Sequence, residues 1–310
     1  MTQRILITGA AGYIGHQLGN RLAFDLQVMG TDLRSRDDVT FPIHILDIRA
    51  PELAELLHRE QITHVVHLAS VLQASKDRRR DYDIDVNGTR NVLESCLKAG
   101  VRHLTITSSG AAYGYHPDNP AWIDETHALR GNPEFAYSDH KRLVEEMLAE
   151  YRHHHPELQQ LIFRPGTVLG ADTRNQITDL FMAPRILSLK GSDSPFVFVW
   201  DQDVIGAMEM GLRQGKTGTY NMAGDGALSM REIAARLNKP LRTLPVWLVK
   251  IALQLAQWRG KPTSPAQVKF LQYRPVLSNR RLKEEFGYPL RKTSAETFEY
   301  YAQRSGARKA

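Results

Sequence analysis

The chain has 310 residues, of which 42% are hydrophobic and 24% charged, proportions typical of a soluble globular protein with a sizeable core. Its formal net charge of +6 suits anionic ligands such as a dinucleotide or a nucleotide-sugar. The sequence has no zinc-finger spacing, no basic heptads and no interleaving of basic with aromatic residues, so nucleic acid is not expected as a partner. The single cysteine, Cys96, excludes an intramolecular disulfide and fits a reducing compartment.

The sequence predicts a cytoplasmic protein without stable membrane insertion. The first residues run directly into a predicted strand and lack the charged-then-apolar profile of a signal peptide. The most apolar segment, residues 244–258, is too short to cross a bilayer and contains Lys250. Cys96 falls in a helical pattern, where we expect it to be a small buried hydrophobic residue.

Short apolar runs alternate with helix-length patterns over the first half of the chain, which indicates βαβ units with right-handed crossovers. Because these runs are apolar almost throughout, both faces of the sheet should be covered. The sequence therefore predicts an α/β fold with a doubly wound parallel sheet of the Rossmann type. The predicted strands are residues 4–8, 26–31, 43–46, 64–68, 104–107 and 161–163, and the predicted helices are residues 14–22, 51–60, 83–99 and 137–152.

The alternation loosens after Arg164, which predicts a smaller second domain. We expect residues 1–165 to form a dinucleotide-binding domain with a returning segment at about 196–222, and residues 166–195 and 223–310 to form a substrate domain. The later local signals are strands at 196–199 and 218–221, a helix at 204–212 with Asp203 as its N-cap, and capping boxes at 229–232 and 293–296 that open two helices.

Three glycines, Gly9, Gly12 and Gly15, fall between the first strand and the first helix. In this context glycine permits a tight turn, lets backbone N–H groups approach a pyrophosphate, and allows the helix to pack closely on the strand. The spacing is one residue longer than the dehydrogenase fingerprint, and the alternative is that the glycines only end a strand. Asp32 ends the second strand, where a carboxylate accepts hydrogen bonds from ribose hydroxyls.

The carboxylate of Asp32 would repel a 2′-phosphate, so NAD is favoured over NADP as the cofactor. Arg34 and Arg36 follow closely and could reach such a phosphate, which keeps NADP open. Asp47, after the third strand, is placed to accept from the adenine amine or, alternatively, to cap a helix. No metal site is predicted, because the consecutive histidines His153-His154-His155 point in different directions.

Tyr137 and Lys141 are one helical turn apart and follow the serine-containing stretch Ser108–Gly114. A neighbouring ammonium group on the same helical face favours the ionised form of a phenol. Tyr137 is therefore the candidate general acid/base at a carbinol or carbonyl oxygen. Ser109 would donate to the same oxygen, and Lys141 would also hold the nicotinamide ribose.

With these motifs the chain resembles the extended short-chain dehydrogenase/reductase family, of the NAD-dependent epimerase/dehydratase type. The resemblance covers nearly the whole chain and implies a homodimer formed by the helices near 83–99 and 137–152. The segments that carry it are Thr8–Gly15, Asp32, Asp47–Ile48, His67–Ser70, Asn87–Thr89, Ser109–Gly114, Tyr137–Lys141 and Arg164–Gly166.

The resemblance also implies which residues line the cofactor. Ala69 and Ser70 would face the nicotinamide side, Asn87 would brace the loop beneath it, and Pro165 and Gly166 would lie by the nicotinamide amide. The expected cofactor contacts are Gly9, Ala11, Gly12, Tyr13, Ile14, Gly15, Asp32, Leu33, Arg34, Asp47, Ile48, Leu68, Ala69, Ser70, Asn87, Thr107, Ser108, Tyr137, Lys141, Arg164, Pro165 and Gly166.

The C-terminal part is similar to the 3β-hydroxysteroid dehydrogenase and dihydroflavonol reductase branch, at residues 245–258, 263–277 and 286–289. That branch oxidises or reduces lipophilic alcohols and ketones, so the resemblance implies a small-molecule substrate of this kind. Trp200 stands where many relatives have a histidine, and no role is carried over to that position. The motifs by which related epimerases bind UDP or TDP are not matched here.

The first hypothesis is an NAD-dependent oxidoreductase that transfers a hydride between nicotinamide and a secondary alcohol or ketone, with Tyr137 as general acid/base. The second is a nucleotide-sugar 4-epimerase of the UDP-glucose type, which keeps its NADH bound and returns the hydride to the opposite face of a rotated ketose. A dehydratase is disfavoured because Gly110-Ala111-Ala112 replaces its acid and base triplet. A non-catalytic NAD-sensing regulator is disfavoured by the intact Ser109, Tyr137 and Lys141.

The predicted helix at residues 246–258 has a broad apolar face at positions 247, 248, 251, 252, 255 and 258. We expect this face to pack as part of the core beside a substrate cleft. A flexible lid and attachment to a membrane surface are the alternatives.

Three further features have plain structural explanations. Tyr288 and Lys292 repeat the spacing of the catalytic pair, but Pro289 lies between them and no serine stretch precedes them. Asp124-Glu125 is expected in an acidic surface loop. Arg78-Arg79-Arg80 is expected to be a solvated helix start, with contact to a phosphate-bearing ligand as the alternative.

Overall fold

The computed structural model describes residues 3–72, 75, 77–259 and 264–308. The chain divides into two compact units. Unit 1 comprises Met1–Ser108, His140–Arg164 and Ile205–Tyr220, and unit 2 comprises Ser109–Asp139, Pro165–Val204 and Asn221–Ala310. The units differ from the predicted domains mainly in one segment, 109–139, which lies in unit 2 although it precedes residue 165. The predicted division by function remains a prediction.

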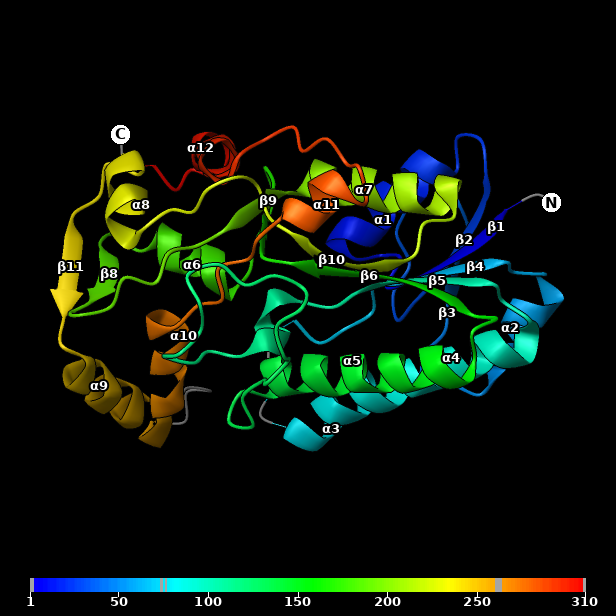
Figure 1. The fold of residues 1–310 in the computed structure, drawn as a ribbon, viewed down its shortest axis with the longest axis horizontal. Helices are drawn as coiled ribbons and strands as arrows, with labels where there is room; N and C mark the ends of the chain where they lie inside the picture. The colour runs from blue at the N-terminus through cyan, green and yellow to red at the C-terminus, as the bar shows by residue number, and fades with distance from the viewer. Residues whose placement is uncertain (1–2, 73–74, 76, 260–263, 309–310) are drawn as a thin grey trace. The chain divides into compact units, whose positions relative to one another are not determined.

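Unit 1 is built on a seven-stranded sheet with the strand order β10-β6-β5-β4-β1-β2-β3 (Figure 1). All five neighbouring pairs from β3 to β6 are parallel. The direction of winding reverses between β1 and β4, and ligands of open α/β sheets bind at such a switch point. The strands are β1 (Arg4–Thr8), β2 (Gln27–Asp32), β3 (Ile43–Ile45), β4 (His64–His67), β5 (His103–Thr107), β6 (Gln159–Pro165) and β10 (Gly218–Met222). The predicted doubly wound fold is confirmed.

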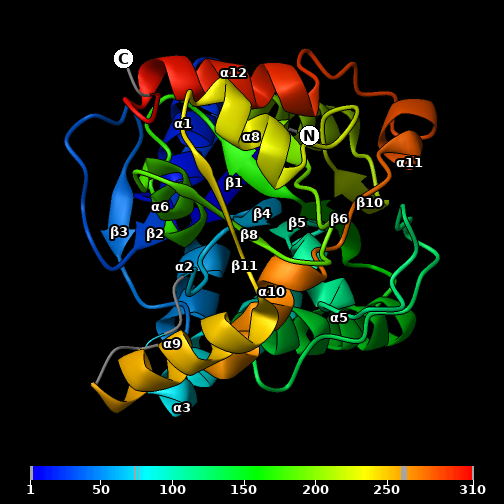
Figure 2. The same ribbon diagram turned by 90° about the vertical axis from the view of Figure 1, so that its left-hand side faces the viewer.

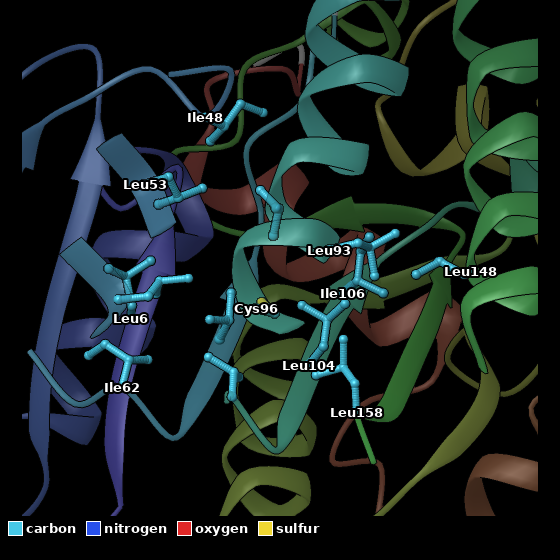
Figure 3. Close-up of a cluster of buried hydrophobic side chains, with 14 of the residues drawn as sticks. Leu6, Ile48, Leu53, Ile62, Leu93, Cys96, Leu104, Ile106, Leu148 and Leu158 are labelled. Carbon is cyan, nitrogen blue, oxygen red and sulfur yellow. The ribbon is translucent and has the colours of Figure 1, made fainter. Parts of the chain in front are cut away.

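Helices cover both faces of this sheet, as the apolar strands require. One face carries α1 (Tyr13–Leu22) and the unit 1 part of α7 (Asp201–Gln214), and the other carries α2 (Glu52–Arg59), α4 (Gly88–Ala99) and α5 (Ala136–His154) (Figure 1). Between the sheet and the second group lies the main core of unit 1, where Leu6, Leu104 and Ile106 meet Leu93 and Cys96 (Figure 3). Cys96 is fully buried as predicted, and burial raises the pKa of its thiol.

The helical segment before Ala99 begins earlier than predicted. It starts with α3 (Arg78–Tyr82), passes through one π-helical turn, η1 (Asp83–Asn87), and continues as α4. The carboxylate of Asp77 accepts from the backbone N–H groups of Arg79 and Arg80 and caps α3. The arginines are exposed, which agrees with the predicted solvated helix start.

Unit 2 contains two small parallel sheets and several short helices (Figure 2). The capping boxes predicted at Ser229 and Thr293 are confirmed, and they open α8 and α12. The strands are β7 (Thr167–Leu169) with β9 (Phe198–Trp200), and β8 (Ile186–Leu189) with β11 (Leu241–Leu244). The helices are η2 (Gly110–Tyr113), α6 (Gln176–Met182), α8 (Met230–Arg236), α9 (Val246–Trp258), η3 (Pro265–Gln267), α10 (Val268–Gln272), α11 (Arg280–Glu284) and α12 (Ser294–Arg304).

Aromatic side chains dominate the core of unit 2. Phe181 makes edge-to-face contacts with Phe196 and Phe198, and Phe298 packs against the same cluster. Such pairs stabilise a core beyond the area that they bury. This cluster joins β9 to α6 and α12, which the sequence did not predict to meet.

Asp203 was expected to be the N-cap of a helix, and this prediction is wrong. The helix α7 begins at Asp201, and the fully buried carboxylate of Asp203 lies within its first turn. It accepts from the hydroxyl of Tyr288 at 3.3 Å and from the guanidinium of Arg291 at 3.0 Å. Tyr288, the tyrosine that repeats the spacing of the proposed catalytic pair, thus makes a structural hydrogen bond within unit 2.

The expected packing of α9 is also wrong. The positions predicted to face the core, among them Trp247, Ile251 and Leu255, are exposed. The helix packs instead through Val249 and Leu253, which contact Leu189 and its neighbours. The amphipathic pattern was correctly recognised, but the buried side is the other one.

Candidate active site

The glycine turn of unit 1 leaves no room for side chains. Gly9 has φ +70°, and a Cβ there would lie 2.7 Å from the backbone N of Ala69. A Cβ on Gly15 would lie 2.3 Å from the carbonyl oxygen of Gly9. Because real Cβ atoms do not approach backbone this closely, only glycine fits at both positions. The turn therefore brings β1, the start of α1 and the loop after β4 into direct contact.

The N-terminus of α1 has no side-chain cap. Gly12 is the N-cap residue and provides no side-chain cap, and the first turn contains no acidic residue. The first N–H groups of a helix have no partner within the helix, and the helix dipole favours an anion there. This end of the ten-residue helix fits the pyrophosphate of a dinucleotide.

Asp32, at the end of β2, lies beside this turn. Its carboxylate accepts from the backbone N–H of Ala11 at 2.9 Å and of Arg34 at 3.3 Å. A carboxylate has further lone pairs, so hydroxyl donors can still be accepted. Arg36 makes two hydrogen bonds of 2.6 Å to Asp38 and donates to the carbonyl oxygen of Ala11 at 3.2 Å, so its guanidinium lies at the same turn. The adjoining Leu33 is exposed.

Asp47 does not cap a helix. The N-cap of α2 is Pro51, and the carboxylate of Asp47 accepts from the backbone and guanidinium of Arg49. The hydrogen bonds from Arg49 are the main cause that lowers the pKa of Asp47. Ile48 is buried in the core of unit 1, so only its backbone remains for a ligand. Helix capping by Asp47 is excluded, and the adenine contact stays a prediction.

Asp85 holds the loop that follows β4, a role that the sequence analysis missed. Its Oδ1 accepts from the hydroxyl of Ser70 at 2.9 Å and from the N–H of Val71 at 2.8 Å, and its Oδ2 lies 3.0 Å from Nδ1 of His140. Burial would raise the pKa of Asp85, but the bond to His140 and the other contacts outweigh it and lower the pKa. Asn87, which was expected to brace this loop, donates to Asp83 instead. In the sequence, the available sign of this role was an aspartate two residues before that asparagine.

His67 fixes the carboxyl end of β4 to its neighbours. The ring is fully buried, with Nδ1 2.7 Å from the hydroxyl of Thr8 and Nε2 3.0 Å from the hydroxyl of Thr89. Burial, together with the positive charge of Lys141, lowers the pKa of His67 to about 3. A neutral imidazole therefore ties β1 to the start of α4 at the edge that bears the glycine turn.

Lys141 is buried on the unit 1 part of α5. Its ammonium group donates to the carbonyl oxygen of Thr107 at 3.1 Å, at the end of β5. The next residue, Ser108, has a buried hydroxyl to which no partner is assigned within the described residues. Arg164 forms a buried pair with Glu145, with Nε 2.7 Å from Oε1, so its guanidinium has a structural partner inside unit 1.

In unit 2, Ser109 opens the short helix η2. Its hydroxyl oxygen accepts from the N–H of Ala111 at 3.1 Å, and a hydroxyl that accepts can still donate its proton. Ser138 donates to the carbonyl oxygen of Ala111 at 2.7 Å. Ser138 follows Tyr137 directly, so this bond fastens the first turn of α5 to the serine turn. The sequence analysis did not single out Ser138.

Tyr137 lies in the first turn of α5 and is half-buried. Tyr115 is a near neighbour: burial raises the pKa of Tyr115, and the adjacent phenol of Tyr137 raises it further. Tyr115 in turn contacts the rings of Phe135 and Phe270 edge to face. Tyr137 therefore lies within electrostatic range of Tyr115, whose own ring packs against two phenylalanines.

Gly166, also in unit 2, is tightly enclosed. Its N–H donates to the carbonyl oxygen of Met222 at 2.9 Å, and a Cβ there would lie 2.8 Å from Cγ2 of Val197. Together with Pro165, it forms a rigid connection from β6 to β7.

Asp124 and Glu125 do not form a carboxylate pair. Asp124 is half-buried and accepts from Thr126 and His127 within its own loop. Glu125 accepts from the N–H of Asn221 at 2.6 Å and is part of the scaffold of unit 2.

A doubly wound parallel sheet with a close-packed glycine turn at the end of β1 is typical of Rossmann-type dinucleotide-binding proteins. The chain belongs to the NAD dependent epimerase/dehydratase family, whose model matches residues 5–222. NAD is the cofactor of this family, and the N-terminus of α1, which has no side-chain cap and no acidic residue in its first turn, fits that group with Asp32 beside it.

Similar proteins include both epimerases and a dehydrogenase. The chain is 25% identical to an uncharacterized protein of Mycobacterium tuberculosis, over 97% of this chain and 84% of the relative. It is 29% identical to the N-acetyl-alpha-D-glucosaminyl-diphospho-ditrans,octacis-undecaprenol 4-epimerase of Escherichia coli, over 58% of this chain and 53% of the relative. It is 26% identical to the sterol-4-alpha-carboxylate 3-dehydrogenase of Saccharomyces cerevisiae, over 59% of this chain and 56% of the relative.

The fold is also that of solved members of the group. The UDP-glucose 4-epimerase of Thermus thermophilus, solved with NAD, superposes with a TM-score of 0.74 at 23% identity, over 97% of this chain and 98% of that chain. Across the described residues, no helix is both long and apolar enough to cross a membrane.

Proposed function

We propose that this chain is an NAD-dependent oxidoreductase that interconverts a secondary alcohol and a ketone. The observation that carries the proposal is the helix start of α5, where Ser138 fastens the turn of Ser109 next to Tyr137. Lys141 follows one turn later on the same helix. This combination supplies a hydrogen-bond donor, a phenol and an ammonium group, which are the groups that proton transfer to a carbonyl oxygen requires.

Each residue has a distinct part in the proposed chemistry. Tyr137 moves the proton to or from the substrate oxygen. Ser109 donates to the same oxygen and orients it, while its own oxygen is held by Ala111. Lys141, whose ammonium group donates to the carbonyl oxygen of Thr107, follows Tyr137 by one helical turn and would hold the nicotinamide ribose. The nicotinamide ring, when bound, supplies the hydride acceptor or donor.

Unit 1 binds the cofactor in this proposal. The glycine turn takes the pyrophosphate, and Asp32 accepts from the adenosine ribose, which favours NAD over NADP. The loop held by Asp85, with Ala69 and Ser70, takes the nicotinamide side.

Unit 2 provides the substrate site in this proposal. It contains a hollow of about 440 Å³ between β8, β11 and the start of α8, with Arg274 at its wall. Its lining, which includes Ser188, Asp193 and Arg231, lies in the predicted substrate domain but includes neither Ser109 nor Tyr137, so the hollow is not assigned to the reacting end of the substrate. A lipophilic small molecule is the proposed substrate class, supported by the names of two relatives, which specify an undecaprenol-linked sugar and a sterol.

The second candidate is a 4-epimerase acting on a nucleotide- or lipid-linked sugar. The relatives from E. coli and T. thermophilus favour it. It would use the same three residues, so geometry alone does not separate the two reactions. A cytoplasmic homodimer formed through α4 and α5 is part of either proposal.

The test is a screen of secondary alcohols, ketones and nucleotide-sugars, following NADH at 340 nm and sugar isomers by chromatography. Net NADH formation or consumption with an alcohol or ketone supports the oxidoreductase. Sugar interconversion without added NAD, by protein that keeps a 340 nm band through gel filtration, supports the epimerase. NAD binding without either reaction, unchanged in a Tyr137→Phe variant, would support the regulator instead.

A further inference from the structure

The helix α9 directs its most apolar side chains to solvent. In this 13-residue helix, five large hydrophobic residues are more than a third exposed, although monomeric surfaces seldom gather such residues in one patch. Their exposed fractions are 63% for Trp247, 37% for Leu248, 49% for Ile251, 42% for Leu255 and 75% for Trp258.

These residues form one stripe. Positions 247, 251, 255 and 258 recur at helical spacing and lie on one face. The opposite face is already packed within unit 2, where Val249 and Leu253 contact Leu189 and Val268. Figure 2 shows α9 beside α10 in this unit. Because α9 is held through its other side, the stripe is not needed for folding.

The surrounding sequence carries charge of one sign only. Residues 233–283 contain no aspartate or glutamate. They contain the basic residues Arg236, Lys239, Arg242, Lys250, Arg259, Lys261, Lys269, Arg274, Arg280, Arg281 and Lys283. Some of these are neutralised by other parts of unit 2, as Lys269 is by Glu134.

The basic residues nearest to the stripe are not neutralised. Arg242 in β11, Lys250 in α9 and Arg259 at its C-cap are all exposed. Within the part of the chain that the structure describes, none of the three forms an ion pair. An apolar stripe is therefore bordered by free positive charges.

We propose that α9 docks on the surface of an anionic lipid bilayer, parallel to the membrane plane. Helices that lie at this interface combine an apolar face with basic flanks, and tryptophan prefers the headgroup region. Trp247 and Trp258 stand at the two ends of the stripe, where both can reach that region. Anionic headgroups attract each nearby lysine or arginine. At 13 residues the helix lies on the membrane and does not cross it.

Charge argues against the other occupants of this face. If two copies of the chain paired through this face, Lys250 and Arg259 of one copy would lie against the same positive charges on α9 of the other. Closure of α9 as a lid would break the contacts of Val249 and Leu253. The proposal goes beyond the proposed function and does not depend on it, because it concerns a surface formed by unit 2 alone.

The test is vesicle flotation of the full chain. Two vesicle types are used: phosphatidylcholine alone, and phosphatidylcholine with about one-third phosphatidylglycerol. We expect binding to the anionic vesicles that weakens as salt is raised. The double variant Trp247→Gln/Trp258→Gln should bind at least tenfold more weakly. The matched control is Trp122→Gln, at a half-exposed tryptophan of unit 2 that lies outside α9. This variant should bind like the wild type.

A second variant separates charge from apolar burial. Lys250→Glu/Arg259→Glu should lose at least tenfold on anionic vesicles, since each basic residue near the surface contributes roughly fivefold. Thermal unfolding and gel filtration of all variants show whether folding or assembly has changed. The proposal is overturned if the wild type does not float, or if the variants float equally well. It is also overturned if the tryptophan variant separates a wild-type oligomer into single chains, because the face would then be an interface between copies.

Discussion

Unit 1 and unit 2 hold their proposed site residues by different physical means. In unit 1 the glycine turn is fixed by backbone packing, and a Cβ at Gly9 or Gly15 would collide with main-chain atoms. In unit 2 the site depends on hydroxyl groups, since the bonds of Ser109 and Ser138 to Ala111 shape the turn beside Tyr137. A site enclosed by backbone tolerates almost no change. A site built from side-chain hydrogen bonds can be altered residue by residue, which suits the unit that we propose selects the substrate.

The units also differ in where their apolar residues go. The strands β1 and β4 are almost entirely buried in the sheet of unit 1. The helix α9 in unit 2 is as apolar, but much of its surface is exposed. A strand covered on both faces has one possible environment, whereas an amphipathic helix can turn its apolar side to a core or to another surface.

The largest effect is expected for Tyr137→Phe, which tests whether turnover and NAD binding depend on different units. We expect turnover to fall by a factor of about 100 to 10,000, because proton transfer by a positioned side chain contributes that much. NAD affinity should stay within about threefold of the wild type, since the glycine turn of unit 1 is untouched. Steady-state kinetics and titration of NAD by calorimetry measure the two quantities. Equal losses of turnover and of NAD affinity would show that catalysis and NAD binding do not depend on separate units.

The second prediction concerns the stability of unit 1 in acid. The folded-state pKa of His67 is about 3, below the value of about 6.5 for an unfolded chain. A depressed folded pKa stabilises the fold above the unfolded pKa, and the stabilisation is lost as pH falls from about 6.5 towards 3. The free energy of unfolding should drop by about 1.4 kcal/mol per pH unit from this residue.

Urea unfolding at a series of pH values measures that slope. In His67→Asn the slope between pH 6.5 and 4.5 should be smaller by about that amount. His58→Gln, at an exposed histidine of α2, serves as the control and should follow the wild type. Parallel curves for the wild type and His67→Asn would contradict the assignment.

The third prediction tests the backbone packing of the glycine turn. Gly15→Ala places a Cβ where only 2.3 Å separates it from the carbonyl oxygen of Gly9. Overpacking of this kind costs about 1–3 kcal/mol. Because the turn must shift to accommodate the new Cβ, NAD affinity should fall about tenfold to a hundredfold. Gly100→Asn is the control, because the space around Gly100 is open and asparagine tolerates its φ of +70°. Unchanged affinity in Gly15→Ala would show that the turn is not the pyrophosphate site.

The smallest expected effect is on cofactor choice. Asp32→Asn keeps the shape of the side chain but removes the charge that repels a 2′-phosphate. The ratio of NAD to NADP affinity should fall about tenfold, as expected when a charged hydrogen bond is weakened. Fluorescence titration with NADH and NADPH measures the ratio. If it does not move, the ribose is bound elsewhere.

Much of unit 1 could be predicted from the sequence. The strands of the parallel sheet, the glycine turn and the acidic residue that ends β2 follow from apolar runs and short motifs in the sequence. The hydrogen bonds of Asp85 could not be predicted, since its partners Ser70 and His140 are distant in sequence. The early start of the helix at Arg78 was missed for a local reason: its cap, Asp77, precedes a run of charged residues with no apolar periodicity.

Unit 2 was less predictable. Its short strands β7, β8 and β11 pair with partners far along the chain, and three or four residues carry too little periodicity to show this. Asp203 looked like a helix cap because it precedes an apolar pattern, but α7 begins two residues earlier. Of the proposed catalytic residues, Ser109 and Tyr137 were visible as a motif. The hydroxyl of Ser138, which joins them, was not.

The most direct test of the account follows a labelled hydrogen. A substrate found in the screen is deuterated at its carbinol carbon and mixed with NAD under single-turnover conditions, and the cofactor is analysed by mass spectrometry. Wild type should yield NADH one mass unit heavier, and Tyr137→Phe, with NAD still bound, should yield almost none within the same time. Deuterium that stays off the cofactor in the wild type, or transfer at full rate in the variant, would contradict hydride transfer assisted by Tyr137.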